Sequence, residues 1–122
     1  MRTLRYNQAV REALFQEMAR DERVFVYGED VAHHGGVFRV TEGLLDRFGP
    51  ERVFDTPIAE SGIVGLGVGA ALMGMRPVAE IQFTDLITVA MDQLISSAAK
   101  ARFVTDGAMH VPLVVRTVNL GK

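Results

Sequence analysis

The chain has 122 residues, of which 48% are apolar and 23% charged, and its formal net charge is −2 at pH 7. This composition is typical of a folded domain and excludes a disordered chain, a collagen-like repeat and a strongly basic nucleic-acid-binding protein. The absence of cysteine excludes a disulfide framework, a thiolate metal site and a cysteine nucleophile. No apolar run reaches the roughly 18 residues of a membrane span, and residues 1–5 lack the apolar stretch of a signal peptide. We therefore expect one cytoplasmic domain with no membrane or nucleic-acid partner.

Apolar residues recur at helical spacing in some segments and form short β-branched or aromatic runs in others. The segments with helical spacing predict helices over residues 3–20, 41–48, 60–73 and 85–103. The short apolar runs predict strands over residues 23–27, 53–55, 78–81 and 111–115. Residues 28–40 contain glycine and polar residues and predict a loop. Thr41 and Asp85 are expected to cap the helices that begin with them.

The alternation of strands and helices predicts an α/β fold, with a parallel sheet covered by helices on both faces. In such sheets, ligands bind beyond the carboxyl ends of the strands. The loops after Tyr27, Asp55 and Ile81 are therefore the first places to look for a site.

The predicted helix over residues 60–73 contains four glycines, each costing about 1 kcal/mol relative to alanine. They are Gly62, Gly65, Gly67 and Gly69. Close packing of this helix against a neighbouring element explains them better than phosphate binding. The spacing of the dinucleotide-binding pattern and the Gly-Lys-Ser/Thr of a phosphate loop are both missing.

Acidic residues stand at the predicted strand ends. Glu60 begins the glycine-rich helix, and the residues alone leave two roles open, a favourable charge at a helix N-terminus or a functional acid among apolar neighbours. Glu29 and Asp30 follow the first strand, where a turn that ends the strand is the preferred interpretation. His33 and His34 are adjacent, so their side chains diverge, which favours a solvated loop over a metal site.

Several stretches of the chain together resemble one known family. They are Gly28-Glu29-Asp30-Val31, residues 35–44 (GGVFRVTEGL), residues 48–60 (FGPERVFDTPIAE), residues 74–83 (GMRPVAEIQF), Asp92-Gln93 and residues 112–116 (PLVVR). This series resembles the β subunit of the E1 component of 2-oxo acid dehydrogenases that act on pyruvate, branched-chain 2-oxo acids or acetoin. The resemblance implies a thiamine diphosphate-binding fold, with residues 1–122 forming the transketolase-like module that holds the aminopyrimidine ring.

The resemblance also implies roles for individual residues. Glu60 takes the place of the catalytic glutamate that hydrogen-bonds the pyrimidine nitrogen N1′ and favours the imino tautomer. Glu29, Ile58 and Gln82 match residues near the ring, and Leu86 stands where the family usually has a stacking aromatic residue. Leu113 matches a position whose backbone carbonyl joins a potassium site in some members.

The implied partners complete the reaction. An α chain, in an α2β2-type assembly with a β–β contact, would hold the diphosphate and Mg²⁺. The assembly would decarboxylate a small 2-oxo acid oxidatively and transfer the acyl group to a lipoyl-bearing E2.

The family pattern continues after Arg116 to a histidine motif and a C-terminal domain, neither of which is in this sequence. We therefore expect a truncated chain that is inactive on its own. The rival interpretation is a catalytically silent scaffold domain that keeps the fold, and a weaker one is an unrelated flavodoxin-like ligand binder.

Overall fold

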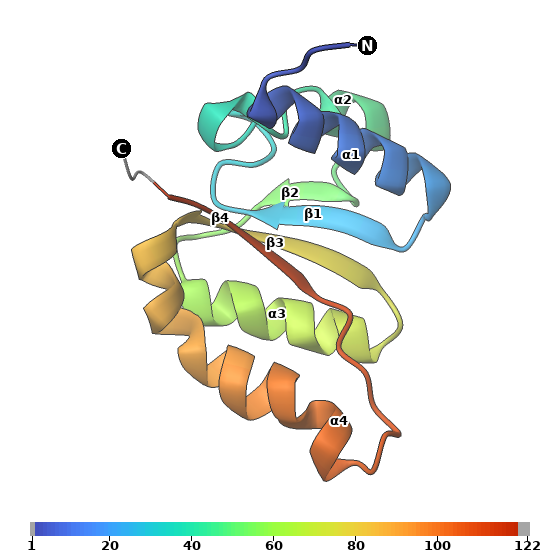
Figure 1. Ribbon diagram of the computed structural model, residues 1–122, viewed down its shortest axis with the longest axis vertical. Helices are drawn as coiled ribbons and strands as arrows, with labels where there is room; N and C mark the ends of the chain where they lie inside the picture. Colours follow the sequence, from blue (N-terminus) through green and yellow to red (C-terminus); the bar gives the residue numbers. More distant parts are fainter. Residues whose placement is uncertain (1, 120–122) are drawn as a thin grey trace.

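A computed structural model describes residues 2–119 and has a four-stranded parallel sheet at its centre. The strands are β1 (Val24–Gly28), β2 (Val53–Asp55), β3 (Arg76–Phe83) and β4 (Val114–Val118), in the order β2-β1-β3-β4. Helices α1 (Tyr6–Arg20) and α2 (Leu44–Phe48) cover one face, and α3 (Glu60–Leu72) and α4 (Lys100–Val104) lie on the other (Figure 1). The predicted α/β fold is therefore confirmed.

The two faces of the sheet bury different side chains because successive residues of a strand point to opposite sides. Valines of β1, β2 and β3 pack against Leu14 and Met18 of α1. On the other face, the rings of Phe25, Tyr27 and Phe54 have their centroids 5.2 to 5.9 Å apart. These rings pack with Ile63 of α3, so each face of the sheet carries an apolar layer.

The element boundaries differ from the predicted ones at both ends of the chain. Helix α1 begins at Tyr6 rather than at residue 3. Strand β4 runs over Val114–Val118 rather than residues 111–115, because Pro112 has no N–H to donate to a ladder. The residues around this proline instead form a tight turn, in which the Leu113 N–H donates to the Val111 carbonyl at 2.8 Å.

The predicted cap at Thr41 is wrong. Helix α2 begins only after Gly43, which is its N-cap residue and has a left-handed φ of 82°. Thr41 is fully buried, and its Oγ1 donates instead to the Val31 carbonyl at 2.6 Å. This threonine therefore closes the preceding loop rather than starting a helix.

The predicted helix over residues 85–103 is divided into three pieces, and the predicted cap at Asp85 is also wrong. A 3₁₀ segment, η2 (Thr84–Ala90), is followed by a π segment, η3 (Gln93–Ala99), and then by α4. Phe83 is the residue before η2, and no side chain caps that end. The β-branched residues 87–89 have low helix propensity, and the Val89 carbonyl accepts a hydrogen bond from Ser61 Oγ of α3 at 2.6 Å.

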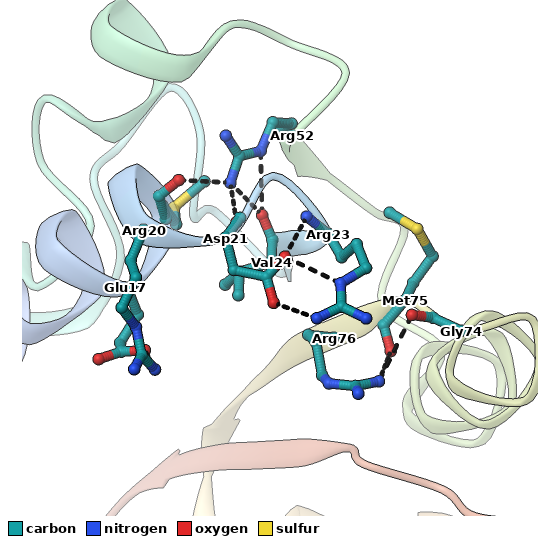
Figure 2. Close-up of polar contacts among 10 residues, drawn as sticks. Glu17, Arg20, Asp21, Arg23, Val24, Arg52, Gly74, Met75 and Arg76 are labelled. Atoms are coloured by element: carbon teal, nitrogen blue, oxygen red, sulfur yellow. Dashed lines mark hydrogen bonds and ion pairs between the residues drawn. The ribbon is translucent and has the colours of Figure 1, made fainter.

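Arg52, just before β2, ties together three elements at the amino-terminal edge of the sheet. Its Nη2 donates to the Met18 carbonyl in the last turn of α1, at 2.8 Å, and to the Asp21 carbonyl at 3.0 Å. Nε and Nη2 both reach the Val24 carbonyl at the start of β1 (Figure 2). Arg52 thus donates hydrogen bonds to carbonyl groups, including one that the end of α1 leaves without a helical partner.

The glycines of α3 differ in what surrounds them. A Cβ on Gly67 would lie 2.5 Å from the Tyr27 hydroxyl and 2.7 Å from Leu113 Cδ1, whereas a Cβ on Gly69 would meet nothing within 4 Å. The preferred explanation, close packing of this helix, therefore holds at Gly67 and does not account for Gly69.

The two glycines form a matched pair for measuring this difference. Gly67→Ala is expected to lower the free energy of unfolding by about 1–3 kcal/mol, the usual cost of overpacking. Gly69→Ala is expected to raise it by about 0.5–1 kcal/mol, since alanine is the better helix former and the site is open. Urea denaturation of both variants tests this, and equal effects of the two substitutions would contradict it.

Candidate functional site

The loop after β1 is held against the carboxyl end of the sheet by polar side chains. Asp55, the last residue of β2, accepts hydrogen bonds from the backbone N–H groups of Ala32 at 2.7 Å and His33 at 3.3 Å. Gln82 of β3 donates to Asp30 Oδ2 at 2.9 Å. The residues that follow β1 therefore have a defined path, and Glu29 is the first of them.

Two buried carboxyl groups lie close enough to interact electrostatically at this edge of the sheet, on the face that α3 covers. Glu29 directly follows β1 and is 4% exposed, and Glu60 is the first residue of α3 and is 8% exposed. Burial raises the pKa of Glu29 above its ordinary value, and the nearby charges of Glu60 and Asp30 raise it further. The fold therefore brings together the two acids that the resemblance singled out.

Two side chains at this edge, Glu29 and Thr56, have unused hydrogen-bonding capacity. Within residues 2–119, the buried side-chain oxygens without a hydrogen-bond partner are Glu29 Oε1, Thr56 Oγ1 and Glu80 Oε1. Thr56 lies beside the start of the loop, because its N–H donates to the Gly28 carbonyl at 2.8 Å. Since buried polar groups are nearly always paired, the unpaired Glu29 and Thr56 oxygens point to a ligand that supplies donors.

The raised pKa of Glu29 predicts a pH-dependent cost in stability. Because the folded state favours the protonated acid, the chain loses stability as the pH rises through the folded-state pKa of Glu29. Glu29→Gln is therefore expected to be more stable than the parent chain at pH 7–8. This advantage should vanish below about pH 4, where the unfolded chain is also protonated.

Thermal unfolding across this pH range tests the prediction. Glu51→Gln serves as the control, because Glu51 is an exposed acid before β2. A stability difference between Glu29→Gln and the parent that stays constant from pH 4 to pH 8 would contradict the assignment.

The other predicted site residues lie in different surroundings. Ile58 is 79% exposed just before α3, and Gln82 reaches the site through Asp30. Leu86 is half-buried and packs against the apolar cluster beneath α3, and Leu113 packs against the same helix. The structure therefore unites Glu29 and Glu60, places Gln82 and Ile58 nearby, and uses Leu86 and Leu113 in packing.

Ser61 and the two adjacent histidines have ordinary structural roles. Ser61 donates to the Val89 carbonyl and so joins α3 to η2. His33 and His34 are exposed in the loop, and His34 Nδ1 lies 3.4 Å from Asp30 Oδ1. Across the part of the chain that the structure describes, no three histidine, aspartate or glutamate side chains gather as a metal site would require.

Sequence reasoning missed Thr56 as a site residue, and it missed the ion pair of Glu80 with Arg116. Glu80 is fully buried in β3, and Arg116 is its register partner on β4. The signal was available, because Glu80 lies within one predicted apolar strand and Arg116, of opposite charge, directly follows another. No sequence signal distinguished Thr56 from an ordinary loop threonine.

Among residues 2–119, no helix has the length and apolar character needed to cross a membrane.

Comparison with known proteins agrees with this arrangement. The family model described as "Transketolase, pyrimidine binding domain" matches residues 2–117. The chain is 53% identical over 116 residues to the 2-oxoisovalerate dehydrogenase subunit beta of Bacillus subtilis, covering 95% of this chain and 36% of that protein. It is 55% identical over 114 residues to the 3-methyl-2-oxobutanoate dehydrogenase subunit beta of Mycobacterium tuberculosis (93% and 33%). It is 47% identical over 112 residues to the pyruvate dehydrogenase E1 component subunit beta of Rickettsia bellii (92% and 34%).

The chain spans about a third of the length of these relatives. The part it spans contains the sheet and both acids of the site. With a matching model over residues 2–117, the chain belongs to the transketolase pyrimidine-binding domain family.

Proposed function

We propose that this chain is the pyrimidine-binding part of an E1 β subunit, acting in the oxidative decarboxylation of a 2-oxo acid. The observation that carries the proposal is the convergence of two buried acids at the carboxyl edge of a parallel sheet, Glu29 directly after β1 and Glu60 at the start of α3. The names of the relatives, which act on pyruvate or branched-chain 2-oxo acids, support the same reaction class.

The residues at this edge fit the aminopyrimidine ring of thiamine diphosphate. That ring offers an amino donor and nitrogen acceptors, and Glu29 Oε1 and Thr56 Oγ1 are buried oxygens without partners. A protonated carboxyl group is the donor that a ring nitrogen requires. Burial raises the pKa of Glu29, which favours the protonated form of this acid beside the ring.

Glu60 has the central role in this proposal, as the acid that holds a proton at the ring nitrogen. When bound, thiamine diphosphate supplies the electron sink for decarboxylation. Glu60 is fixed by its place at the first position of α3, and the neighbouring Ser61 anchors that helix end to Val89. A catalytic proton needs such a positioned group in a site that excludes water.

The rest of the assembly completes the proposal. An α chain would hold the diphosphate and Mg²⁺, a second β chain would complete the α2β2 form, and a lipoyl E2 would accept the acyl group. Leu113 would contribute its backbone carbonyl to a potassium site, and the assembly would work in the cytoplasm. Leu86 would form an apolar wall in place of a stacking ring.

Calorimetry separates this function from a silent scaffold. Thiamine diphosphate with Mg²⁺ is titrated into the chain alone and into the chain mixed with an E1 α chain. Binding that requires the α chain and is lost in Glu60→Ala supports the proposal. If the two chains associate but the cofactor binds neither to the chain alone nor to the mixture, the proposal is wrong and the domain is a scaffold.

A further inference from the structure

Glu80 and Arg116 form a buried ion pair on the face of the sheet opposite the acid pair. Glu80 is fully buried in β3, and Arg116 Nη1 of β4 binds its Oε2. We propose that this pair is a positioning device that holds the loop of residues 29–41 in the conformation that presents Glu29. The inference deepens the proposed function and rests on it for the role of Glu29.

The loop passes close to the Glu80 carboxylate. Gly36 has a φ of +72°, and a Cβ there would lie 3.2 Å from Glu80 Oε1 and 2.8 Å from Thr41 Oγ1. The backbone N–H of Val37 faces the same carboxylate. Burial raises the pKa of Glu80, and Arg116 and this N–H act against that rise. The carboxylate therefore lies between a guanidinium on its own sheet and the backbone of the loop.

The loop has a conformation that needs such support. Asp30, Phe38 and Arg39 have φ values of 56°, 56° and 58°, in the left-handed region that non-glycine residues rarely adopt. Each such residue costs on the order of 1–2 kcal/mol and persists only where its surroundings impose it. Asp30 directly follows Glu29, so release of the loop would change the direction of the Glu29 side chain.

An ion pair is not needed merely to pack this sheet. Two buried charges are costly to remove from water, and apolar residues of similar size often replace such a pair without loss of stability. Apolar residues cannot, however, present a negative charge to the backbone N–H of Val37. The pair is therefore best explained by what it does for residues 36 and 37, which lie beside it in the loop.

The double variant Glu80→Met/Arg116→Met tests the proposal, because it removes both charges and leaves neither one unpaired. Amide hydrogen exchange of the chain is measured first, without cofactor. Exchange of residues 31–41 is expected to be roughly tenfold faster or more, with the amides of β1 and β3 unchanged. In an assembled E1 that carries this domain, affinity for thiamine diphosphate should fall about tenfold and kcat should fall. KM for the 2-oxo acid should stay within about twofold, since the loop acts through Glu29.

Val78→Ala is the matched control, because it weakens the core on the same face of β3 and leaves the ion pair intact. It should lower the melting temperature without selective exchange in residues 31–41 and without a change in cofactor affinity. If the double variant does not fold, Glu80→Leu/Arg116→Leu removes the same two charges with other apolar side chains and should give the same selective exchange.

The outcomes are distinct. Unchanged exchange of residues 31–41 overturns the positioning role, whatever the activity. Faster exchange with unchanged cofactor affinity and kcat overturns the link from the loop to Glu29. Loss of cofactor binding in the parent assembly contradicts the proposed function instead, and the exchange result still decides what holds the loop.

Discussion

Glu60→Gln is expected to lower the rate of 2-oxo acid decarboxylation by roughly 100-fold or more, the range for loss of a positioned proton donor or acceptor. Glutamine keeps the size of the side chain and its place at the start of α3, so the fold should remain intact. The measurement is the steady-state rate of an assembled E1 carrying this domain with an α chain. Because the loss concerns the chemical step, kcat should fall much more than KM rises.

Glu22→Gln provides the control for this experiment. Glu22 is an exposed glutamate at the opposite edge of the sheet, just before β1. Its replacement should leave the rate within about twofold, as expected for a surface substitution away from the site. A Glu60→Gln enzyme with the parent rate would remove Glu60 from the chemistry, whatever its effect on stability.

Arg52→Met is expected to lower the free energy of unfolding by about 2–4 kcal/mol. The guanidinium donates to the carbonyls of Met18, Asp21 and Val24, and hydrogen bonds from a charged group contribute about 1.5–3 kcal/mol each, partly recovered when water replaces them. Arg52→Lys should lose most of the same energy, because an ammonium group cannot span three carbonyls in this fork. Denaturant unfolding of both variants measures the effect.

Arg47→Met distinguishes the stability contributed by these hydrogen bonds from that of the cation–π contact with Phe48. Arg47 and Arg52 both place a guanidinium over Phe48, at 5.6 Å and 5.2 Å from the ring centroid. Loss of the ring contact alone costs about 0.5–1 kcal/mol at an exposed site. If Arg47→Met and Arg52→Met destabilise equally, the backbone carbonyls are not the source of the effect.

The order and type of the first elements could be read from the sequence because local pattern and tertiary packing agree there. Strand β1 is a continuous apolar run that ends in glycine, and it is buried along its whole length. The predicted helix over residues 60–73 corresponds to α3 within one residue. Both segments therefore form elements of the type that the local pattern predicts.

The later elements could not be read in the same way, because tertiary contacts decide them. The apolar spacing of residues 85–103 is helical, but it does not distinguish an α-helix from successive 3₁₀ and π turns. The hydrogen bond from Ser61 to Val89 comes from another helix and has no local signature. Likewise, Thr41 looks like a cap in sequence, yet the carbonyl that it binds belongs to Val31 across the loop.

The candidate site, too, could be predicted only in part from the sequence. The position of Glu60 suggested a site but left a structural explanation equally open, and the family resemblance decided between them. The sequence did not indicate which face of the sheet each acid occupies. That depends on the strand register, which places Glu80 opposite Arg116 on one face and leaves Glu29 with Glu60 on the other.

The strand order has a consequence for how the chain folds. Strand β1 lies inside the sheet, but its partner β3 begins only at Arg76, and β4 joins through β3. During synthesis, one edge of β1 therefore stays without a partner until β3 has been made. Parallel pairing over such separations is slow, because the loop must close before any contact forms. We expect nascent chains that end before β3 is complete to expose an unpaired strand edge that is prone to aggregation.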